Sequence, residues 1–340
     1  MYKIFGILLL SFSFTSALIV PFINLLYKFR FRQKRVITKN ATGQRKLHSW
    51  KVGTPIGGGI LIIISVLLFS TLFYSVTSYT VNWTTITLLL TLILFGFLGL
   101  YDDLRKFFRF GKKHIRVLPP FVKFGIQILT ASIIAYFLYQ KMGLSTLHLP
   151  ILEPIWNIGP IDLGWVYIPM AAFIIVSSSN AFNITDGLDG LSTGLLMIAL
   201  SAFWYLASFS PFSGDIMVFI AVLMGALIPY LYFNIYPARL WLGDTGSLAF
   251  GALLAVIALM SEQTLILPFI GGMFVVEICS SFLQIISLKF RNGKKIFKLA
   301  PLHHHFEAMG WEETKVTMRF WLIGVIFAWI GIFIASFSFS

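Results

Sequence analysis

Charged residues are scarce in this 340-residue sequence: they make up 11% of it, whereas 58% of the residues are hydrophobic. A soluble protein has about a quarter charged residues and nearer half apolar ones, so the composition excludes an ordinary soluble fold. Cysteine is almost absent too. The single Cys279 excludes an intramolecular disulfide, and its apolar surroundings predict a small core residue.

Long apolar runs take the place of the missing charge. About 20 apolar residues cross roughly 30 Å of hydrocarbon as a helix. Ten such spans are predicted, at 4–27, 56–76, 84–101, 119–140, 165–181, 191–209, 215–233, 247–261, 265–288 and 318–337. The least secure are 165–181 and 247–261, because they are short. We expect an all-α integral membrane protein whose residues 1–340 form a single polytopic domain.

Basic residues predict the orientation, because Lys and Arg in short loops are retained in the cytoplasm. They concentrate in the loops after the first, third and ninth spans, and only Lys3 and Lys141 lie on the opposite side. Both termini are therefore predicted to be periplasmic. The net charge of +13 reflects this topology and attraction to anionic lipid. Nucleic-acid binding is not expected, because no basic stripe alternates with aromatics on a soluble module.

The longest connection on the predicted outer side is the segment 141–164. It contains Pro150, Pro154, Gly159 and Pro160, which interrupt helices. We expect short strands or a hairpin there.

Carboxylates persist beside the apolar runs in spite of their cost, about 3 kcal/mol at a bilayer centre on insertion scales. They are Asp102, Asp103, Asp186, Asp189 and Asp244. Helix capping explains one such residue more readily than five that accompany a run of three histidines. The predicted topology places all of them on the cytoplasmic side. The sequence therefore predicts one inner-face site built from several loops.

The run from Asn180 to Leu191 is the most specific stretch. Asn183, Asp186 and Asp189 recur every three residues, so a continuing helix would keep them broadly on one side, while the intervening glycines permit close backbone approach. Carboxylates with an amide suit Mg²⁺ and sugar hydroxyls. A polar helix start with a capping residue is the alternative.

Two glycine-containing stretches carry weaker signals. The turn around Asp244, Gly243-Asp244-Thr245-Gly246-Ser247, can offer backbone N–H groups to a phosphate and a carboxylate to a metal, but it also resembles a helix cap. The segment 53–59 lacks the Gly-Lys-Ser/Thr of a P-loop. Its glycines are more typical of tight turns or of helix packing in membranes.

The run His303, His304 and His305 is not a typical zinc site, because adjacent side chains on a helix cannot all face one ion. With Pro301 before it and Glu307 after it, the run predicts a loop that donates hydrogen bonds to phosphate or a nucleobase. One histidine is a candidate for proton transfer, and structural roles are expected for one or two of the three.

Taken in order, these stretches resemble the bacterial polyprenyl-phosphate N-acetylhexosamine-1-phosphate transferases. The similar stretches are Lys51 with Gly53-Thr54-Pro55, Asp102-Asp103 with Lys106, 180–191, 234–247 and 301–307. The triple histidine, followed by Gly310-Trp311, points to the branch that transfers phospho-N-acetylmuramoyl-pentapeptide. One departure is that Ile56 and Gly57 stand where the family usually has Thr and Met, which removes a hydroxyl.

The resemblance implies ten transmembrane helices, outward termini and a homodimer in the bacterial inner membrane. It implies Mg²⁺-dependent transfer from UDP-N-acetylmuramoyl-pentapeptide to undecaprenyl phosphate, giving lipid I and UMP. It assigns catalysis to Asp102, Asp103, Asp244 and His303, with Asp244 as the metal ligand. It assigns substrate binding to Lys51, Thr54, Lys106, Asn183, Asp186, Asp189, Asn234, His304 and His305.

Two other functions remain open from the sequence. A sister transferase would load N-acetylglucosamine-1-phosphate from UDP-N-acetylglucosamine, and the histidine run counts against it. A transporter or lipid flippase would hold its carboxylates near the middle of the membrane. The predicted positions of the aspartates at inner helix ends count against that class.

Overall fold

The computed structural model describes residues 2–32, 53–77, 79–108, 119–156 and 158–337. Helices dominate it. Their bounds are α1 (Tyr2–Lys28), α3 (Gly58–Val76), α4 (Trp83–Phe108), α5 (Pro120–Met142), α6 (Leu152–Trp156), η2 (Gly164–Val166), α7 (Tyr167–Thr185), α8 (Leu191–Ala207), α9 (Ser213–Asn234), α10 (Gly243–Met260), α11 (Leu267–Ile270), α12 (Gly272–Phe290), α13 (Leu302–Ala308) and α14 (Glu313–Ser336).

Nine helices within the described ranges are long and apolar enough to cross a membrane: α1, α3, α4, α5, α7 with η2, α9, α10, α12 and α14. The apolar helix α8 is shorter, with 17 residues. The chain is therefore an all-α, multi-pass integral membrane protein. Both spans predicted as least secure are helices of at least 18 residues, and the run 265–288 is divided between α11 and α12 at Gly271.

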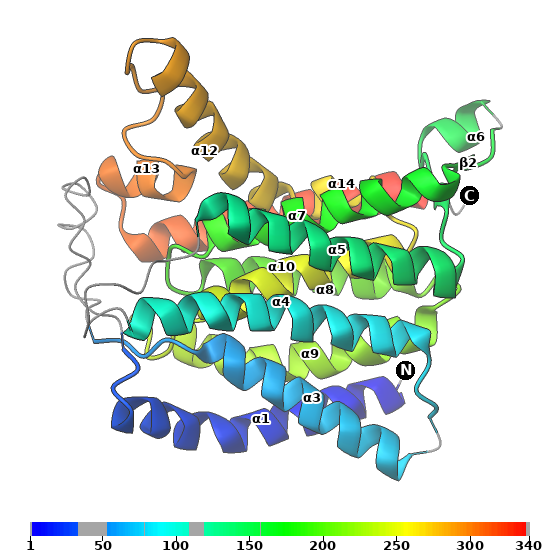
Figure 1. Cartoon of the computed structure of the whole chain (residues 1–340), viewed down its shortest axis with the longest axis horizontal. Coiled ribbons are helices and arrows are strands. Elements are labelled where there is room, and N and C mark those ends of the chain that lie inside the picture. Colours follow the sequence, from blue (N-terminus) through cyan, green and yellow to red (C-terminus); the bar gives the residue numbers. More distant parts are fainter. Residues whose placement is uncertain (1, 33–52, 78, 109–118, 157, 338–340) are drawn as a thin grey trace.

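The long helices lie side by side, and both termini are at one end of the bundle (Figure 1). At the opposite end lie the connections from α7 to α8, from α9 to α10 and from α12 to α13. Helix α10 is buried on all sides from Thr245 to Met260, as expected of a helix that is apolar all round. It packs against α3, α4 and α7.

The predicted hairpin in 141–164 is confirmed. Strand β1 (Thr146–Leu147) pairs antiparallel with β2 (Ile161–Asp162), and α6 lies between them. The Asp162 carboxylate accepts a hydrogen bond from the Gly164 N–H at 3.0 Å, which lowers the pKa of Asp162 together with a hydrogen bond from Ser145. The hairpin lies at the end of the bundle that carries the termini (Figure 1).

The expectation that Cys279 is a core residue is wrong, because its side chain is exposed on α12. Helix α12 runs outward from the bundle in Figure 1. In a membrane protein an apolar run faces lipid as readily as protein, so apolar neighbours do not predict burial in the protein core.

Candidate active site

Two carboxylates from different helices share one lysine. The Nζ of Lys123 on α5 lies 2.7 Å from Asp102 Oδ2 on α4 and 3.0 Å from Asp244 Oδ2 on α10. The half-exposed Lys106 adds a second ammonium, 2.8 Å from Asp244 Oδ2 and 3.8 Å from Asp102 Oδ2. Asp102 Oδ1 is buried and makes no hydrogen bond within the described ranges. The sequence-predicted Asp102, Lys106 and Asp244 thus converge at one end of the bundle.

Asp103 holds the first turn of α10. Its Oδ1 accepts the Asp244 N–H at 3.0 Å, and its Oδ2 accepts the N–H and the hydroxyl of Thr245 at 2.9 and 2.7 Å. A carboxylate at a helix N-terminus satisfies free donors and the helix dipole together. Asp103 therefore fixes the backbone that carries Asp244, and these N–H groups are not left for a phosphate.

Glycines bring the backbones of three helices into contact beside this cluster. A Cβ on Gly99 of α4 would clash with the Asp244 carbonyl oxygen, and a Cβ on Gly59 of α3 would clash with the Gly246 nitrogen. The N–H groups of Gly58 and Gly59 donate to the carbonyls of Trp241 and Leu242. The packing interpretation of segment 53–59 is thus supported, since its glycines join α3 to the start of α10.

The run from Asn180 to Leu191 is not one helix. Helix α7 ends at Thr185, and Gly190 takes a left-handed φ of 76° before α8 begins. The shared face expected for Asn183, Asp186 and Asp189 is therefore not formed. Their partners lie in different places.

Asn183 donates to the Ser247 hydroxyl at 2.6 Å, and Asp186 accepts the hydroxyl of Ser192. Asp189 instead accepts the Ala238 N–H at 2.9 Å and the Trp241 Nε1–H at 3.2 Å. Asn183 and Asp186 remain near the carboxylate cluster. Asp189 anchors the connection between α9 and α10.

The surroundings of Asp186 make its ionised form costly. Removal from solvent raises the pKa of Asp186 to about 6, and the neighbouring Asp244, Asp103 and Asp189 act in the same direction. The hydrogen bond from Ser192 opposes these effects. A cation bound here would offset the cost of the ionised form.

The buried Asn234 side chain hydrogen-bonds to the turn before α8 and to the connection between α9 and α10. Its Oδ1 accepts the Gly190 N–H at 3.2 Å, and its Nδ2 donates to the Leu240 carbonyl at 3.0 Å. Thr54 precedes Pro55, whose carbonyl accepts the Trp241 N–H at 2.9 Å. Lys51 lies outside the described residues.

The three histidines lie in the short helix α13 and not in the expected loop. His303 is fully buried, and its Nδ1 lies 2.8 Å from Glu277 Oε2. His304 pairs with Glu307, with its Nδ1 2.7 Å from Oε2, and His305 Nδ1 accepts the Lys298 N–H at 3.0 Å. The rings of His303 and His304 contact each other edge to face, with centroids 4.2 Å apart, whereas the His305 ring packs against Phe297.

His303 connects α13 to the turn that carries Asp186. A Cβ on Gly187 would clash with His303 Nε2, so any larger residue would displace the buried ring. His303 Nε2 is buried and has no hydrogen-bond partner in the described part of the chain. Among the three histidines, His303 is the one seen to contact this turn.

Sequence reasoning missed Lys123 and Glu277. Both lie inside predicted membrane spans, and an ionisable residue in such a span indicates function. Glu277 accepts both the backbone N–H and the ring of His303, and Lys123 joins Asp102 to Asp244.

The donor set fits Mg²⁺, which proteins hold through one or two carboxylates while substrate phosphates and waters complete the shell. Asp244 and Asp102 face a common cation, and the free Asp102 Oδ1 is a further oxygen ligand. Within the described ranges no three His, Cys, Asp or Glu side chains form a metal-binding group. The described side chains alone therefore do not enclose an ion, and substrate phosphates and waters would supply the other ligands.

Comparisons with known proteins identify relatives over nearly the whole chain. Residues 85–262 match Glycosyl transferase family 4. The chain is 40% identical to the phospho-N-acetylmuramoyl-pentapeptide-transferase of Halalkalibacterium halodurans over 327 residues, 96% of each chain. It is 37% identical to the protein of the same name from Rickettsia rickettsii over 345 residues, 96% of this chain and 90% of the relative.

Proposed function

The chain belongs to the phospho-N-acetylmuramoyl-pentapeptide transferases of Glycosyl transferase family 4, and from this premise we propose the reaction that its site performs. The protein transfers phospho-N-acetylmuramoyl-pentapeptide from UDP-N-acetylmuramoyl-pentapeptide to undecaprenyl phosphate. The products are lipid I and UMP. The observation that carries the assignment to this site is the convergence of Asp102 and Asp244 on one cation.

In the proposed reaction, an oxygen of the lipid phosphate attacks the β-phosphorus of the donor. The bond from the β-phosphorus to the bridging oxygen breaks, and UMP leaves with that oxygen. Phosphoryl transfer of this kind depends on positioning and charge stabilisation. The lipid phosphate has a second pKa of about 6 and is mostly dianionic at neutral pH, so no base is required to activate it.

Asp102 orients the acceptor through its free Oδ1, and Asp103 keeps Asp244 in place. Lys106 and Lys123 supply positive charge to the diphosphate. When bound by Asp244, with Asp102 facing it, Mg²⁺ would offset the charge that develops on the diphosphate. The buried His303 Nε2 is the candidate for proton transfer or hydrogen bonding at the Asp186 turn.

We further propose that the site faces the cytoplasm of the bacterial inner membrane and that α8 is a tenth span. The excess of Lys and Arg in the predicted inner loops supports this orientation. A cytoplasmic site also suits a soluble nucleotide donor. A homodimer is expected from the family.

Measurement of UMP release tests the function. The purified protein is offered undecaprenyl phosphate and Mg²⁺ with either UDP-N-acetylmuramoyl-pentapeptide or UDP-N-acetylglucosamine. Turnover of the pentapeptide donor alone is expected. Turnover of the glucosamine donor alone would move the chain to the sister transferases, and no turnover in a folded sample would favour a transporter or flippase.

A second experiment tests the one-step route. Protein incubated with donor and Mg²⁺, without acceptor, is digested and searched for a phosphorylated aspartate by mass spectrometry. We expect no modified peptide containing Asp102 or Asp244. A trapped aspartyl intermediate that acceptor then consumes would establish the two-step route instead.

A further inference from the structure

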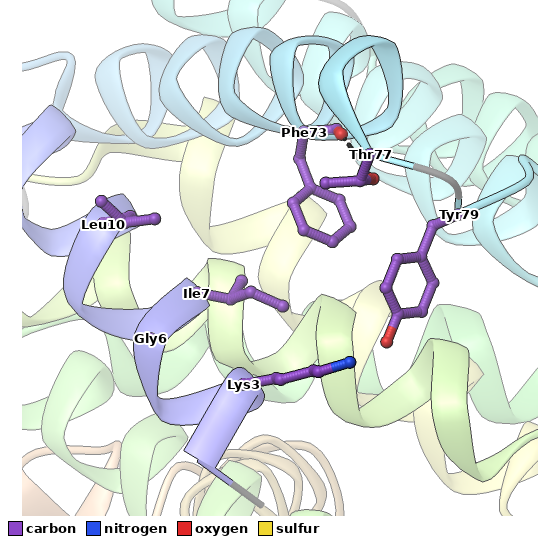
Figure 2. A pocket seen from close by; sticks show the side chains of 7 residues that line it. All are labelled: Lys3, Gly6, Ile7, Leu10, Phe73, Thr77 and Tyr79. Atoms are coloured by element: carbon purple, nitrogen blue, oxygen red, sulfur yellow. Dashed lines mark hydrogen bonds between the residues drawn. The ribbon is translucent and has the colours of Figure 1, made fainter.

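A pocket of about 450 Å³ lies between the first turns of α1 and the end of α3. Its walls are formed by Lys3, Gly6, Ile7, Leu10, Phe73, Thr77 and Tyr79 (Figure 2). The volume is in the range of roughly 300–1,000 Å³ that small-molecule sites occupy. The first turns of α1 and the end of α3 lie at the end of the bundle that carries the termini, and α10, which carries Asp244 in its first turn, begins at the opposite end (Figure 1). Nothing in the proposed reaction uses it.

The walls of the pocket suit a hydrocarbon chain. Ile7, Leu10 and Phe73 are apolar, and a Cβ on Gly6 would meet no atom within 4 Å, so this wall is open. Leu10 is 63% exposed, which places one side of the pocket against the lipid. Residues 3 to 10 rise about 10 Å along α1, so the pocket runs from the helix end toward the hydrocarbon.

The mouth of the pocket carries a lysine that has no ion-pair partner among the described residues. Lys3 stands in the first turn of α1, where the helix dipole disfavours positive charge. No acidic side chain in the described part of the chain forms an ion pair with it. Figure 2 shows the Lys3 side chain and the Tyr79 ring extending toward each other from opposite walls. An ammonium and a phenol together suit a phosphate group.

We propose that this pocket binds an anionic phospholipid such as phosphatidylglycerol. The phosphate lies between the Lys3 ammonium and the Tyr79 hydroxyl, and one acyl chain lies along Ile7, Leu10 and Phe73. Lysine and tyrosine are both typical of the membrane–water boundary, where such a headgroup is found. This site is independent of the proposed function, since none of its lining residues belongs to the carboxylate cluster or to the other proposed catalytic residues.

Native mass spectrometry of the full-length protein tests the proposal. Delipidated protein in detergent is titrated with phosphatidylglycerol or with the zwitterionic phosphatidylcholine. Phosphatidylglycerol is expected to bind more tightly, and Lys3→Gln is expected to weaken the tightest binding event about fivefold, the effect of one lysine near an anionic lipid. Gly6→Leu, which fills the wall without changing charge, is expected to weaken binding of the same lipid.

Lys141→Gln and Gly214→Leu are the matched controls. Lys141 is the other lysine predicted on this side and lies over the Trp83 ring, and a Cβ on Gly214 meets no atom within 4 Å. Both controls should bind phosphatidylglycerol as the unmodified protein does. Equal retention of the two lipids, or equal binding by Lys3→Gln and Lys141→Gln, would overturn the proposal. UMP release should be unchanged in all four variants, which separates this test from that of the transferase activity.

Discussion

The imidazole of His303 and the carboxylate of Glu277 form a pair with no solvent contact, in which Nδ1 and Oε2 are 2.8 Å apart. An ionised carboxylate only accepts hydrogen bonds, so Nδ1 of a neutral ring carries the proton. The lone pair is then on Nε2, which lies against Gly187. Glu277 thereby fixes both the ring orientation and the nitrogen that faces the Asp186 turn.

Glu277→Gln is expected to lower kcat at least tenfold with little change in KM. A Gln amide can donate to Nδ1, which would move the ring proton to Nε2 and remove the lone pair from the turn. Steady-state UMP release and thermal unfolding in detergent measure the effect. A kcat within twofold of the unmodified protein would show that the pair is structural only.

Asp244→Ala is expected to reduce turnover by about 10²-fold or more at any Mg²⁺ concentration, because charge stabilisation at the reacting phosphate is lost. The protein should remain folded. Asp215→Ala is the matched control, since this carboxylate accepts a hydrogen bond from Asn82 at the opposite end of the bundle. Substantial activity in Asp244→Ala across a Mg²⁺ titration would refute the metal-ligand role.

Asp103→Asn is expected to destabilise the protein by about 2 kcal/mol, the combined effect of a lost helix cap and an unsatisfied donor. A neutral amide offers one acceptor oxygen where Asp103 serves three donors. Thr245→Val removes one of those donors and should cost about 1 kcal/mol. Unfolding midpoints measure both. An unchanged midpoint together with lost turnover would assign Asp103 to the chemistry itself.

The raised pKa of Asp186 makes the stability of the folded protein depend on pH. Its pKa is about 6 in the folded protein, whereas an unperturbed aspartate has a pKa of 3.8, so the folded state binds more protons between these values. Stability from this group is therefore lost as pH rises from about 4 to about 6. Without Mg²⁺, the free energy of unfolding of Asp186→Asn should be higher than that of the unmodified protein by up to about 3 kcal/mol at pH 7.5. The two proteins should be equally stable at pH 4.

Asp162→Asn is the control of opposite sign for this experiment. The pKa of Asp162 is lowered, so its stabilising effect is present at neutral pH and is lost on acidification. Thermal unfolding at pH 4 and pH 7.5 distinguishes the two. If Asp186→Asn is no more stable than the unmodified protein at pH 7.5, Asp186 is ionised without penalty.

Much of the fold follows from the apolar runs, because span length and hydrophobicity are local properties. The convergence of Asp102 and Asp244 also follows, since counting spans places both at one end. The sequence does not predict that Asp102 pairs with Lys123 while Asp103 caps α10, because this depends on where the first turn of α10 packs. Asp189 was misplaced for a related reason: the backbone turns at Gly190, and a period of three assumes a continuing helix.

Lys123 and Glu277 could have been found from their positions inside apolar spans. The residues with which Lys123 and Glu277 pair could not have been found in this way. Lys123 meets a residue 121 positions away, and Glu277 meets one 26 positions away. Such pairings are set by helix packing, which one sequence does not encode in any local pattern.

The contact between Gly99 and the Asp244 carbonyl has a consequence for inhibitors. Because no side chain separates these backbones, the spacing of the two carboxylate-bearing helices is a property of the main chain. A compound that engages both Asp102 and Asp244 meets a gap of fixed width. A larger residue at Gly99 would separate the two carboxylates of the proposed site, so we expect a substitution there to lower turnover together with the binding of such a compound.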